Sequence, residues 1–274
     1  MVTLDKPLLW QLHGQVPDAL DILPALRPGP ERNVVVAKGL DDVRVLGVTL
    51  ARGGSKGIPG KNIRPVLGKP LLAYTVEEAL LSRRISRYVV STDSLEIAAV
   101  AREWGAECIE RPKELAGDTT PSLDALRHAV FEVEKQEGVP YDIVVELRVT
   151  NPLKTVDDID GAIEKLIDTR ADSVIGVSLL EDHHPARIKK LVDDRIVDFV
   201  MPEPRDGQRQ LLRPDAYIRN GSIYAVRRDL IMNGAGQLFN HRNSRPWIMS
   251  AEKSINIDTE LDFLLVEALL KRQM

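Results

Sequence analysis

The 274-residue sequence has a single cysteine, Cys108, and its aromatic residues make up only 4% of the chain. One cysteine excludes an intramolecular disulfide and a cysteine-rich metal site, and its apolar setting at 106–109 indicates a buried structural thiol. The five histidines show no His-x-x-x-His or similar ligand spacing, which argues against a zinc site. No Gly-x-Ser-x-Gly motif occurs either, so a hydrolase of that type has no nucleophile here.

Long apolar runs and a large excess of charge of one sign are also absent. No stretch approaches the roughly 18 apolar residues of a membrane span, and Met1–Asp5 lacks the features of a signal peptide. The net charge of −4 and the pI near 5.8 provide no general attraction to nucleic acid or anionic membranes. We therefore expect a globular, cytoplasmic protein that has neither a nucleic acid nor a membrane as its partner.

The most distinctive stretch is Leu50–Ile63, which directly follows the apolar run Val45–Thr49 and contains four glycines. A strand that ends in a glycine-rich loop brings backbone N–H groups close to phosphates. The loop also carries the cations Arg52, Lys56 and Lys61. Fixed cations on such a loop are suited to a polyanion such as a nucleoside triphosphate.

The common phosphate-binding loops do not fit this stretch. A P-loop would need a glycine where Ser55 stands and a Ser or Thr in place of Asn62. A dinucleotide-binding fingerprint is missing as well, and Pro59 prevents a helix from crossing the loop. The alternative without function is a mobile surface loop rich in Gly and Lys.

The rest of the chain from Val45 onward alternates strand-like and helix-like stretches, as parallel α/β proteins do. Strands are expected at 45–49, 88–91, 106–110, 142–147 and 173–179. Helices are expected at 70–81 and 95–104, and again after the capping patterns at Ser122, Thr155 and Thr259. Asp93 follows a strand directly, where it is either a helix cap or a functional carboxylate. Residues 1–44 form an extension of unknown role, with spacing that allows a short amphipathic helix.

Residues 52–62, Arg-Gly-Gly-Ser-Lys-Gly-Ile-Pro-Gly-Lys-Asn, resemble the signature loop of the acylneuraminate cytidylyltransferases. Other segments similar to that family follow in the family's order, at 91–93, 111–118, 148–154, 184–185, 209–210, 217–224 and 254–263. The resemblance implies the three-layer, Rossmann-like α/β fold of the nucleotide-diphospho-sugar transferases. It would form a cytidylyltransferase domain at 45–274, with an inserted dimerisation and sugar-binding lobe at about 181–245.

The implied reaction transfers CMP from CTP to the anomeric hydroxyl of a sialic-acid-type nonulosonic acid, an acidic nine-carbon sugar, and releases pyrophosphate. The resemblance also implies Mg²⁺ or Mn²⁺ as the cofactor and a homodimer or higher homo-oligomer as the assembly. Two alternatives stay open. One is a cytidylyltransferase for another acidic sugar such as Kdo, and the other is a catalytically silent nucleotide-binding homologue.

The same resemblance assigns roles to individual residues. The catalytic residues would be Arg52, Lys61 and Asp258, with the metal on Asp258 and Asp93. The nucleotide would be bound by Ala51, Arg52, Gly53, Gly54, Ser55, Lys56, Lys61, Asn62, Asp93 and Asp118. The sugar would be bound by Arg148, Thr150, Arg187, Arg209, Gln210 and Asn220.

The sequence departs from the family pattern at several positions. Arg148 stands in place of a Gln, Val149 in place of a Pro, Lys154 in place of an Arg, and Asn256 in place of an Asp. Because Arg148 adds a charge and five donors at a strand end, we expect a sugar preference shifted away from N-acetylneuraminic acid. Asn256 offers a carbonyl oxygen without charge, so we expect weaker metal binding in the absence of CTP.

Overall fold

The structure is a computed structural model, and it describes residues 42–54, 57–205, 207–233, 238–240 and 242–273. The expected extension at 1–44 lies almost entirely outside these residues, as do Ser55 and Lys56 of the glycine-rich loop. Within the described part, no helix is long and apolar enough to cross a membrane.

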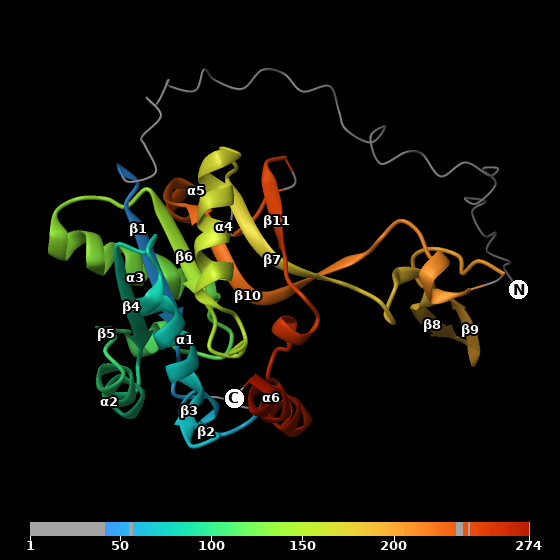
Figure 1. Cartoon of the computed structure of the whole chain (residues 1–274), viewed down its shortest axis with the longest axis horizontal. Helices are drawn as coiled ribbons and strands as arrows, with labels where there is room; N and C mark the ends of the chain where they lie inside the picture. Colours follow the sequence, from blue (N-terminus) through green and yellow to red (C-terminus); the bar gives the residue numbers. More distant parts are fainter. Residues whose placement is uncertain (1–41, 55–56, 206, 234–237, 241, 274) are drawn as a thin grey trace, which may run out of the picture. The chain divides into compact units, whose positions relative to one another are not determined.

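A seven-stranded sheet forms the centre of the fold, in the order β11-β7-β10-β6-β1-β4-β5 (Figure 1). Its strands are β1 (Val45–Leu50), β4 (Arg87–Thr92), β5 (Glu107–Glu110), β6 (Ile143–Leu147), β7 (Ser173–Leu179), β10 (Tyr217–Arg227) and β11 (Ser244–Ile248). β1 pairs in parallel with β4 and β6, whereas β10 runs antiparallel to both β6 and β7. The parallel strands confirm the expected α/β class, while the reversed strand β10 was not expected.

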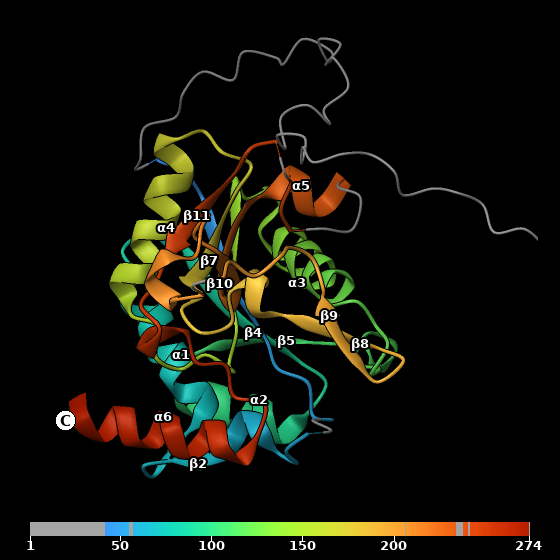
Figure 2. The same ribbon diagram turned by 90° about the vertical axis from the view of Figure 1, so that its right-hand side faces the viewer.

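Helices cover both faces of the sheet (Figure 2). They are α1 (Leu71–Leu81), α2 (Leu95–Glu103), α3 (Ser122–Glu137), α4 (Val156–Asp168), α5 (Arg228–Asn233) and α6 (Glu260–Gln273). One core cluster contains Leu72 of α1 and Ile163 of α4, and the other contains Leu126 of α3 and Ile231 of α5. The sheet thus separates two apolar layers, which confirms the three-layer arrangement.

Local capping explains where several helices begin and end. The Asp158 carboxylate accepts hydrogen bonds from the Thr155 N–H (3.0 Å) and hydroxyl (2.8 Å) at the start of α4. Asp262 binds the Thr259 N–H (2.7 Å) and hydroxyl (2.8 Å) in the same way before α6. Gly138, at φ 74°, ends α3 in the left-handed conformation that glycine adopts without strain. Two of the three capping patterns seen in the sequence are therefore present.

The segment between β7 and β10 carries a separate two-stranded sheet of β8 (Lys189–Val192) and β9 (Arg195–Asp198). A second small hairpin, β2 (Pro65–Val66) with β3 (Lys69–Pro70), precedes α1. β10 and α5 belong to the main body. The lobe expected at about 181–245 therefore overlaps the central sheet, and only its first part, before β10, has a sheet of its own.

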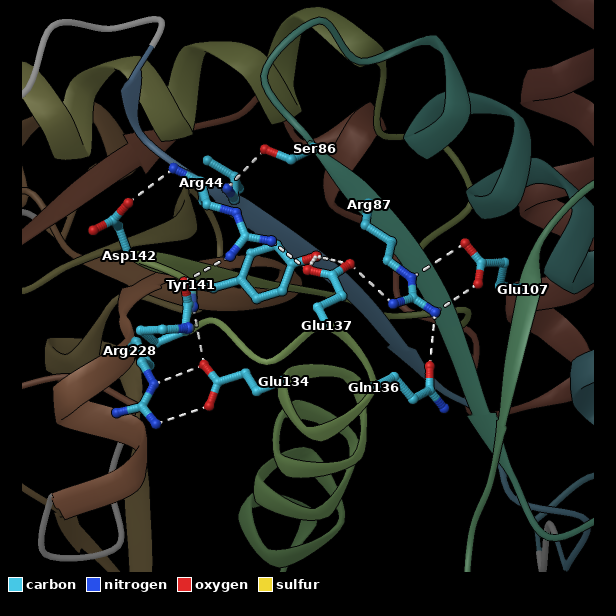
Figure 3. Close-up of polar contacts among 12 residues, drawn as sticks. Arg44, Ser86, Arg87, Glu107, Glu134, Gln136, Glu137, Tyr141, Asp142 and Arg228 are labelled. Carbon is cyan, nitrogen blue, oxygen red and sulfur yellow. Dashed lines mark hydrogen bonds and ion pairs between the residues drawn. The ribbon is translucent and has the colours of Figure 1, made fainter.

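A polar network ties together the amino ends of β1, β4 and β6, at the opposite end of these strands from the glycine-rich loop (Figure 3). The Glu137 carboxylate at the end of α3 accepts hydrogen bonds from Arg44, from Arg87 (2.9 Å) and from the Tyr141 hydroxyl (2.9 Å). Glu134, one helical turn earlier, binds Arg228 through both carboxylate oxygens (2.7 and 2.8 Å). We regard this network as structural.

Glu137→Gln should lower the melting temperature at pH 7 by roughly 3–10 °C, since charge-assisted hydrogen bonds contribute about 1.5–3 kcal/mol. Burial opposes ionisation of Glu137, but its bonds from Arg87, Tyr141 and Arg44 lower its pKa below the usual 4.5. A lowered folded-state pKa stabilises the fold above pH 4.5, and this stabilisation is lost as the pH falls through the folded value. Thermal unfolding at pH 7 and pH 3 checks this.

The control for this experiment is Glu132→Gln on the same helix, where the carboxylate forms a longer ion pair of 3.9 Å with Lys135. It should leave the melting temperature within about 1 °C at either pH, as expected of an exposed pair. A Glu137→Gln deficit of equal size at both pH values would show that the charge of Glu137 is not what stabilises the fold.

Candidate functional site

A cavity of about 590 Å³ opens where β1, β5 and β6 end. Open α/β sheets bind their ligands at this edge. Four segments line the cavity. They are the end of β1 with the loop after it (Leu50, Arg52, Gly57, Lys61, Asn62), the stretch from β5 into α3 (Arg111, Leu115, Gly117, Asp118, Thr120, Ser122, Ala125), the end of β6 with the turn after it (Glu146, Arg148, Val149, Thr150), and the segment before α6 (Asn256, Asp258). Four segments that are distant in sequence thus meet at one site.

The glycine-rich loop is fixed to the neighbouring strand by Asp93. The Asp93 carboxylate accepts a hydrogen bond from the Gly53 N–H (3.0 Å), and a β-carbon at Gly53 would lie only 3.1 Å from that of Ser94. Ser94, not Asp93, caps α2. Asp93 is not among the residues that line the cavity. Asp93 therefore fixes the glycine-rich loop, and its expected role as a metal ligand stays a prediction.

The other expected nucleotide residues surround the loop. Asn62 is buried and donates to the Arg52 carbonyl (3.0 Å), while Ala51 is buried and Gly54 is exposed. The Arg52 guanidinium reaches across the cavity to the Gly117 carbonyl (3.2 Å) and to Asp118 (3.1 Å). Asp118, expected to contact the nucleotide, thus holds Arg52 at the cavity wall.

Lys61 joins the loop to the segment before α6. Its ammonium donates to the Ile257 carbonyl (2.6 Å) and to Asp258 (3.1 Å), and Asn256 donates to the other carboxylate oxygen of Asp258. The Ile257 N–H in turn donates to the Thr150 carbonyl (2.7 Å). The structure therefore brings together the three expected catalytic residues Arg52, Lys61 and Asp258 at one cavity.

The fit of a divalent metal depends on Asp258 and Asn256. Asp258 is 67% exposed and offers two carboxylate oxygens, and the amide of Asn256 can supply one more oxygen. Among the residues that the structure describes, no group of three His, Cys, Asp or Glu side chains could hold a metal. A hard ion such as Mg²⁺ needs only one or two protein carboxylates when phosphates complete its shell. The donor set fits Mg²⁺ together with a phosphorylated substrate.

Arg111 lines the cavity as well, although sequence reasoning assigned it no role of its own beyond its place at the start of the family-like segment 111–118. It is buried beneath the cavity and donates to the Ser91 hydroxyl (3.2 Å) and carbonyl (2.6 Å). Burial lowers its pKa, and the nearby Asp93 partly offsets this effect. The signal in the sequence was its position: Arg111 directly follows a strand and precedes Pro112, at the sheet edge where ligands bind.

Glu146 is the second residue that was missed. Its side chain is 3% exposed, and one carboxylate oxygen accepts a hydrogen bond from the Arg148 Nε (3.2 Å). The Arg148 guanidinium lies over the Tyr224 ring, 4.9 Å from its centroid. Burial alone would lower the pKa of Arg148, but Glu146 and Tyr224 outweigh it and raise that pKa. Arg148 is therefore a fixed, paired cation.

Lys154 lies fully buried beneath the turn that follows β6. Its ammonium donates to the Thr75 hydroxyl (2.8 Å) and to the carbonyls of Arg148 (2.8 Å) and Asn151 (2.6 Å). Burial lowers the pKa of Lys154 to about 7. The lysine holds both ends of the turn that presents Arg148 and Thr150 to the cavity.

The expected sugar residues of the lobe do not reach this cavity in the single chain. Arg187 donates to the Gly207 carbonyl (2.7 Å), and Arg209 pairs with Glu181 (3.1 Å) and Asp182 (3.4 Å). Gln210 bonds to Gln208 (3.1 Å). Asn220 is buried and donates to the Ser254 hydroxyl (3.0 Å). Of the six expected sugar residues, Arg148 and Thr150 line the cavity and these four do not.

The sequence profile of the cytidylyltransferase family matches residues 46–262. The chain is 34% identical over 233 residues to the CMP-N,N'-diacetyllegionaminic acid synthase of Legionella pneumophila, covering 84% of this chain and 97% of that protein. It is 30% identical to the N-acylneuraminate cytidylyltransferase of Escherichia coli, with 81% of this chain and 51% of that protein covered. The chain thus spans about half of the latter relative.

Solved structures share the fold. A CMP:2-keto-3-deoxy-manno-octonic acid synthetase complexed with CTP superposes with a TM-score of 0.63 at 21% identity, covering 84% of this chain and all of that one. The 4-diphosphocytidyl-2C-methyl-D-erythritol synthase of Anaerococcus prevotii gives a TM-score of 0.58 at 14% identity, covering 85% and 98%. At these identities the likeness concerns the fold alone.

Proposed function

Because this chain belongs to the cytidylyltransferase family, we propose that it transfers CMP from CTP to a sialic-acid-type nonulosonic acid and releases pyrophosphate. One observation carries the proposal: a single cavity at the end of β1 collects Arg52, Lys61 and Asp258 on the glycine-rich loop and the segment before α6. The relatives named for legionaminic and N-acylneuraminic acids supply the substrate class.

In the proposed reaction, the anomeric hydroxyl oxygen of the sugar bonds to the α-phosphorus of CTP and gives up its proton. The bond from that phosphorus to the bridging oxygen breaks, and pyrophosphate leaves. In such transfers the protein contributes chiefly by positioning the reactants and by neutralising the charge of the phosphates. Lys61, which already contacts Asp258, and Arg52, held by Asp118, are placed to bind the triphosphate and the departing pyrophosphate.

We also propose Mg²⁺ or Mn²⁺ as cofactor, held by Asp258 with help from Asn256. When bound, the ion would neutralise charge that develops on the phosphate oxygens. Asp93 would act indirectly, by fixing Gly53 of the loop. We place the reaction in the cytoplasm, since the sequence has one cysteine and depends on no disulfide.

The test is to mix the purified full chain with CTP, Mg²⁺ and a panel of acidic sugars, and to measure pyrophosphate release and the mass of the sugar product. The expected product is a CMP-nonulosonic acid. Product with Kdo alone would replace this proposal by the shorter-sugar activity. No product with any sugar, despite CTP binding, would indicate a silent homologue.

We further propose that the chain forms a homodimer through the β8–β9 hairpin and the segment after it. This region exposes Leu191 (79%), Ile196 (74%), Phe199 (57%) and Val200 (72%). Contiguous exposed apolar surface commonly marks a protein interface. In a dimer, Arg187 and Arg209 could also line the cavity of the partner subunit, since they do not reach the cavity of their own chain.

Leu191→Asp combined with Ile196→Asp should therefore convert a dimer into a monomer, because two charges would be buried at the interface. Light scattering coupled to gel filtration measures the mass. Leu95→Asp, at an isolated position of α2 that is 88% exposed, is the matched control and should leave the mass unchanged. A monomeric wild type, or a dimer that survives the double substitution, would contradict this assembly.

A further inference from the structure

One carboxylate oxygen at the cavity has no partner. Glu146 lines the cavity near the end of β6, and its Oε1 binds Arg148. Its Oε2 is buried and makes no hydrogen bond to any described residue. A buried carboxylate oxygen without a partner costs free energy comparable to a lost charge-assisted hydrogen bond. Such an atom in a ligand cavity indicates a group that a ligand completes.

Arg148 is held so that part of its guanidinium stays available. Its Nε is used by Glu146 and its planar group rests on Tyr224 of the neighbouring strand β10. Its two terminal nitrogens make no hydrogen bond within the described part of the chain. Arg148 therefore keeps two terminal donors for a ligand, and it is paired with the residue whose second carboxylate oxygen is buried and unpartnered.

The charge of this pair decides which ligand group suits it. Glu146 and Arg148 together are neutral, so they are no general receptor for an anion. A ligand carboxylate on Arg148 would lie close to the free, negatively charged oxygen of Glu146, and like charges repel. A neutral group with an N–H for Glu146 and a carbonyl oxygen for Arg148 satisfies both, as an amide does.

The cavity has a side for each substrate. The wall after β5 offers the apolar Leu115 and Ala125 with the hydroxyls of Thr120 and Ser122, which suit a planar base and its ribose. The cations Arg52 and Lys61 follow β1, which lies between β4 and β6 in the sheet. Glu146 and Arg148 lie at the end of β6, on the other side of β1 from β4, and this leaves the β6 side of the cavity for the sugar in our assignment.

We propose that Glu146 and Arg148 form one subsite that selects an acylamino substituent of the sugar, and that this sugar's carboxylate is bound elsewhere. The inference rests on the proposed function and deepens it, because it names the feature by which the enzyme chooses among acidic sugars. A site built to hydrogen-bond a substrate group rejects analogues that lack it.

The experiment compares N,N'-diacetyllegionaminic acid with two analogues, each with a hydroxyl in place of one acetamido group. For the wild type, kcat/KM should fall at least tenfold for one analogue. Glu146→Gln keeps the shape of the side chain but removes its charge, and it should reduce this discrimination to less than threefold. The KM for CTP should stay within twofold. The double variant Glu146→Gln with Arg148→Gln leaves no unpaired charge at this position. Its discrimination between the sugars should also fall below threefold.

Asp160→Asn is the matched control, because Asp160 is a buried carboxylate bonded to Ser82 (2.5 Å) away from the cavity. It should leave the ratio between sugars unchanged even where it lowers the melting temperature. Discrimination that persists in folded Glu146→Gln and in the double variant would overturn the subsite. A raised KM for CTP with unchanged sugar ratios would assign the pair to the nucleotide and overturn it too.

Failure of this subsite is distinguishable from failure of the proposed function. Turnover of nonulosonic acids with ratios insensitive to Glu146 leaves the reaction intact and removes only the subsite. If the wild type forms no CMP-sugar at all, the proposed reaction is wrong, and the proposed subsite is then wrong as well.

Discussion

Asp258→Asn is expected to abolish CMP transfer, with a loss of at least a thousandfold in kcat, while the melting temperature changes little. Asp258 is 67% exposed, so the fold does not depend on its burial. It is also the only carboxylate among the described cavity residues that lies beside Lys61. Removing its charge would take away the main protein ligand of the proposed metal. Pyrophosphate release at saturating CTP and sugar measures the loss.

Asn256→Asp provides the complementary test. A second carboxylate beside Asp258 should lower the Mg²⁺ concentration needed for half-maximal rate, because charge is added to the proposed metal site. If the wild type stays fully active in EDTA, the reaction does not need a divalent metal, and the proposed metal role is wrong. An Asp258→Asn variant that melts earlier but turns over normally would make Asp258 a structural residue at the start of α6.

Lys61→Ala should lower kcat/KM for CTP by ten- to about a hundredfold, because it removes a charge-assisted contact worth roughly 1.5–3 kcal/mol. Only 13% of the lysine is exposed, and its ammonium already lies at the cavity, held by Ile257 and Asp258. The measurement is steady-state kinetics with CTP as the varied substrate, accompanied by thermal unfolding.

Lys165→Ala is a suitable control for this substitution. Lys165 also donates to a backbone carbonyl, that of Pro246 (2.7 Å), but it lies on α4 and not at the cavity. It should leave kcat/KM within twofold. Wild-type kinetics in Lys61→Ala would show that the loop does not bind the triphosphate through this residue.

Features encoded locally were predictable from the sequence. The glycine-rich loop follows β1 as expected, and the capping pairs Thr155 with Asp158 and Thr259 with Asp262 form as their spacing indicates. Both depend on residues only a few positions apart, whose geometry the backbone fixes.

Features that depend on tertiary pairing were not predictable in the same way. β10 lies antiparallel between β6 and β7 and places Tyr224 against Arg148. No local sequence pattern predicts this strand order. The sequence therefore showed Arg148 as an added charge, whereas the structure pairs it with Glu146. The arginines of the lobe were expected at the sugar site because their order in the sequence matched the family, but order alone does not fix distance.

The cavity is closed by hydrogen bonds between partners that lie far apart along the chain. Lys61 and Ile257 are separated by 196 positions, and the Ile257 N–H binds the Thr150 carbonyl. During synthesis the amino-terminal strands can pair well before residue 257 leaves the ribosome, since domains form contacts as the chain emerges. Until then Lys61 lacks its anchor and Asp258 does not yet exist in the nascent chain. The cavity is thus among the last parts of the molecule to be completed, because a nascent chain that ends before residue 258 lacks one of the three expected catalytic residues.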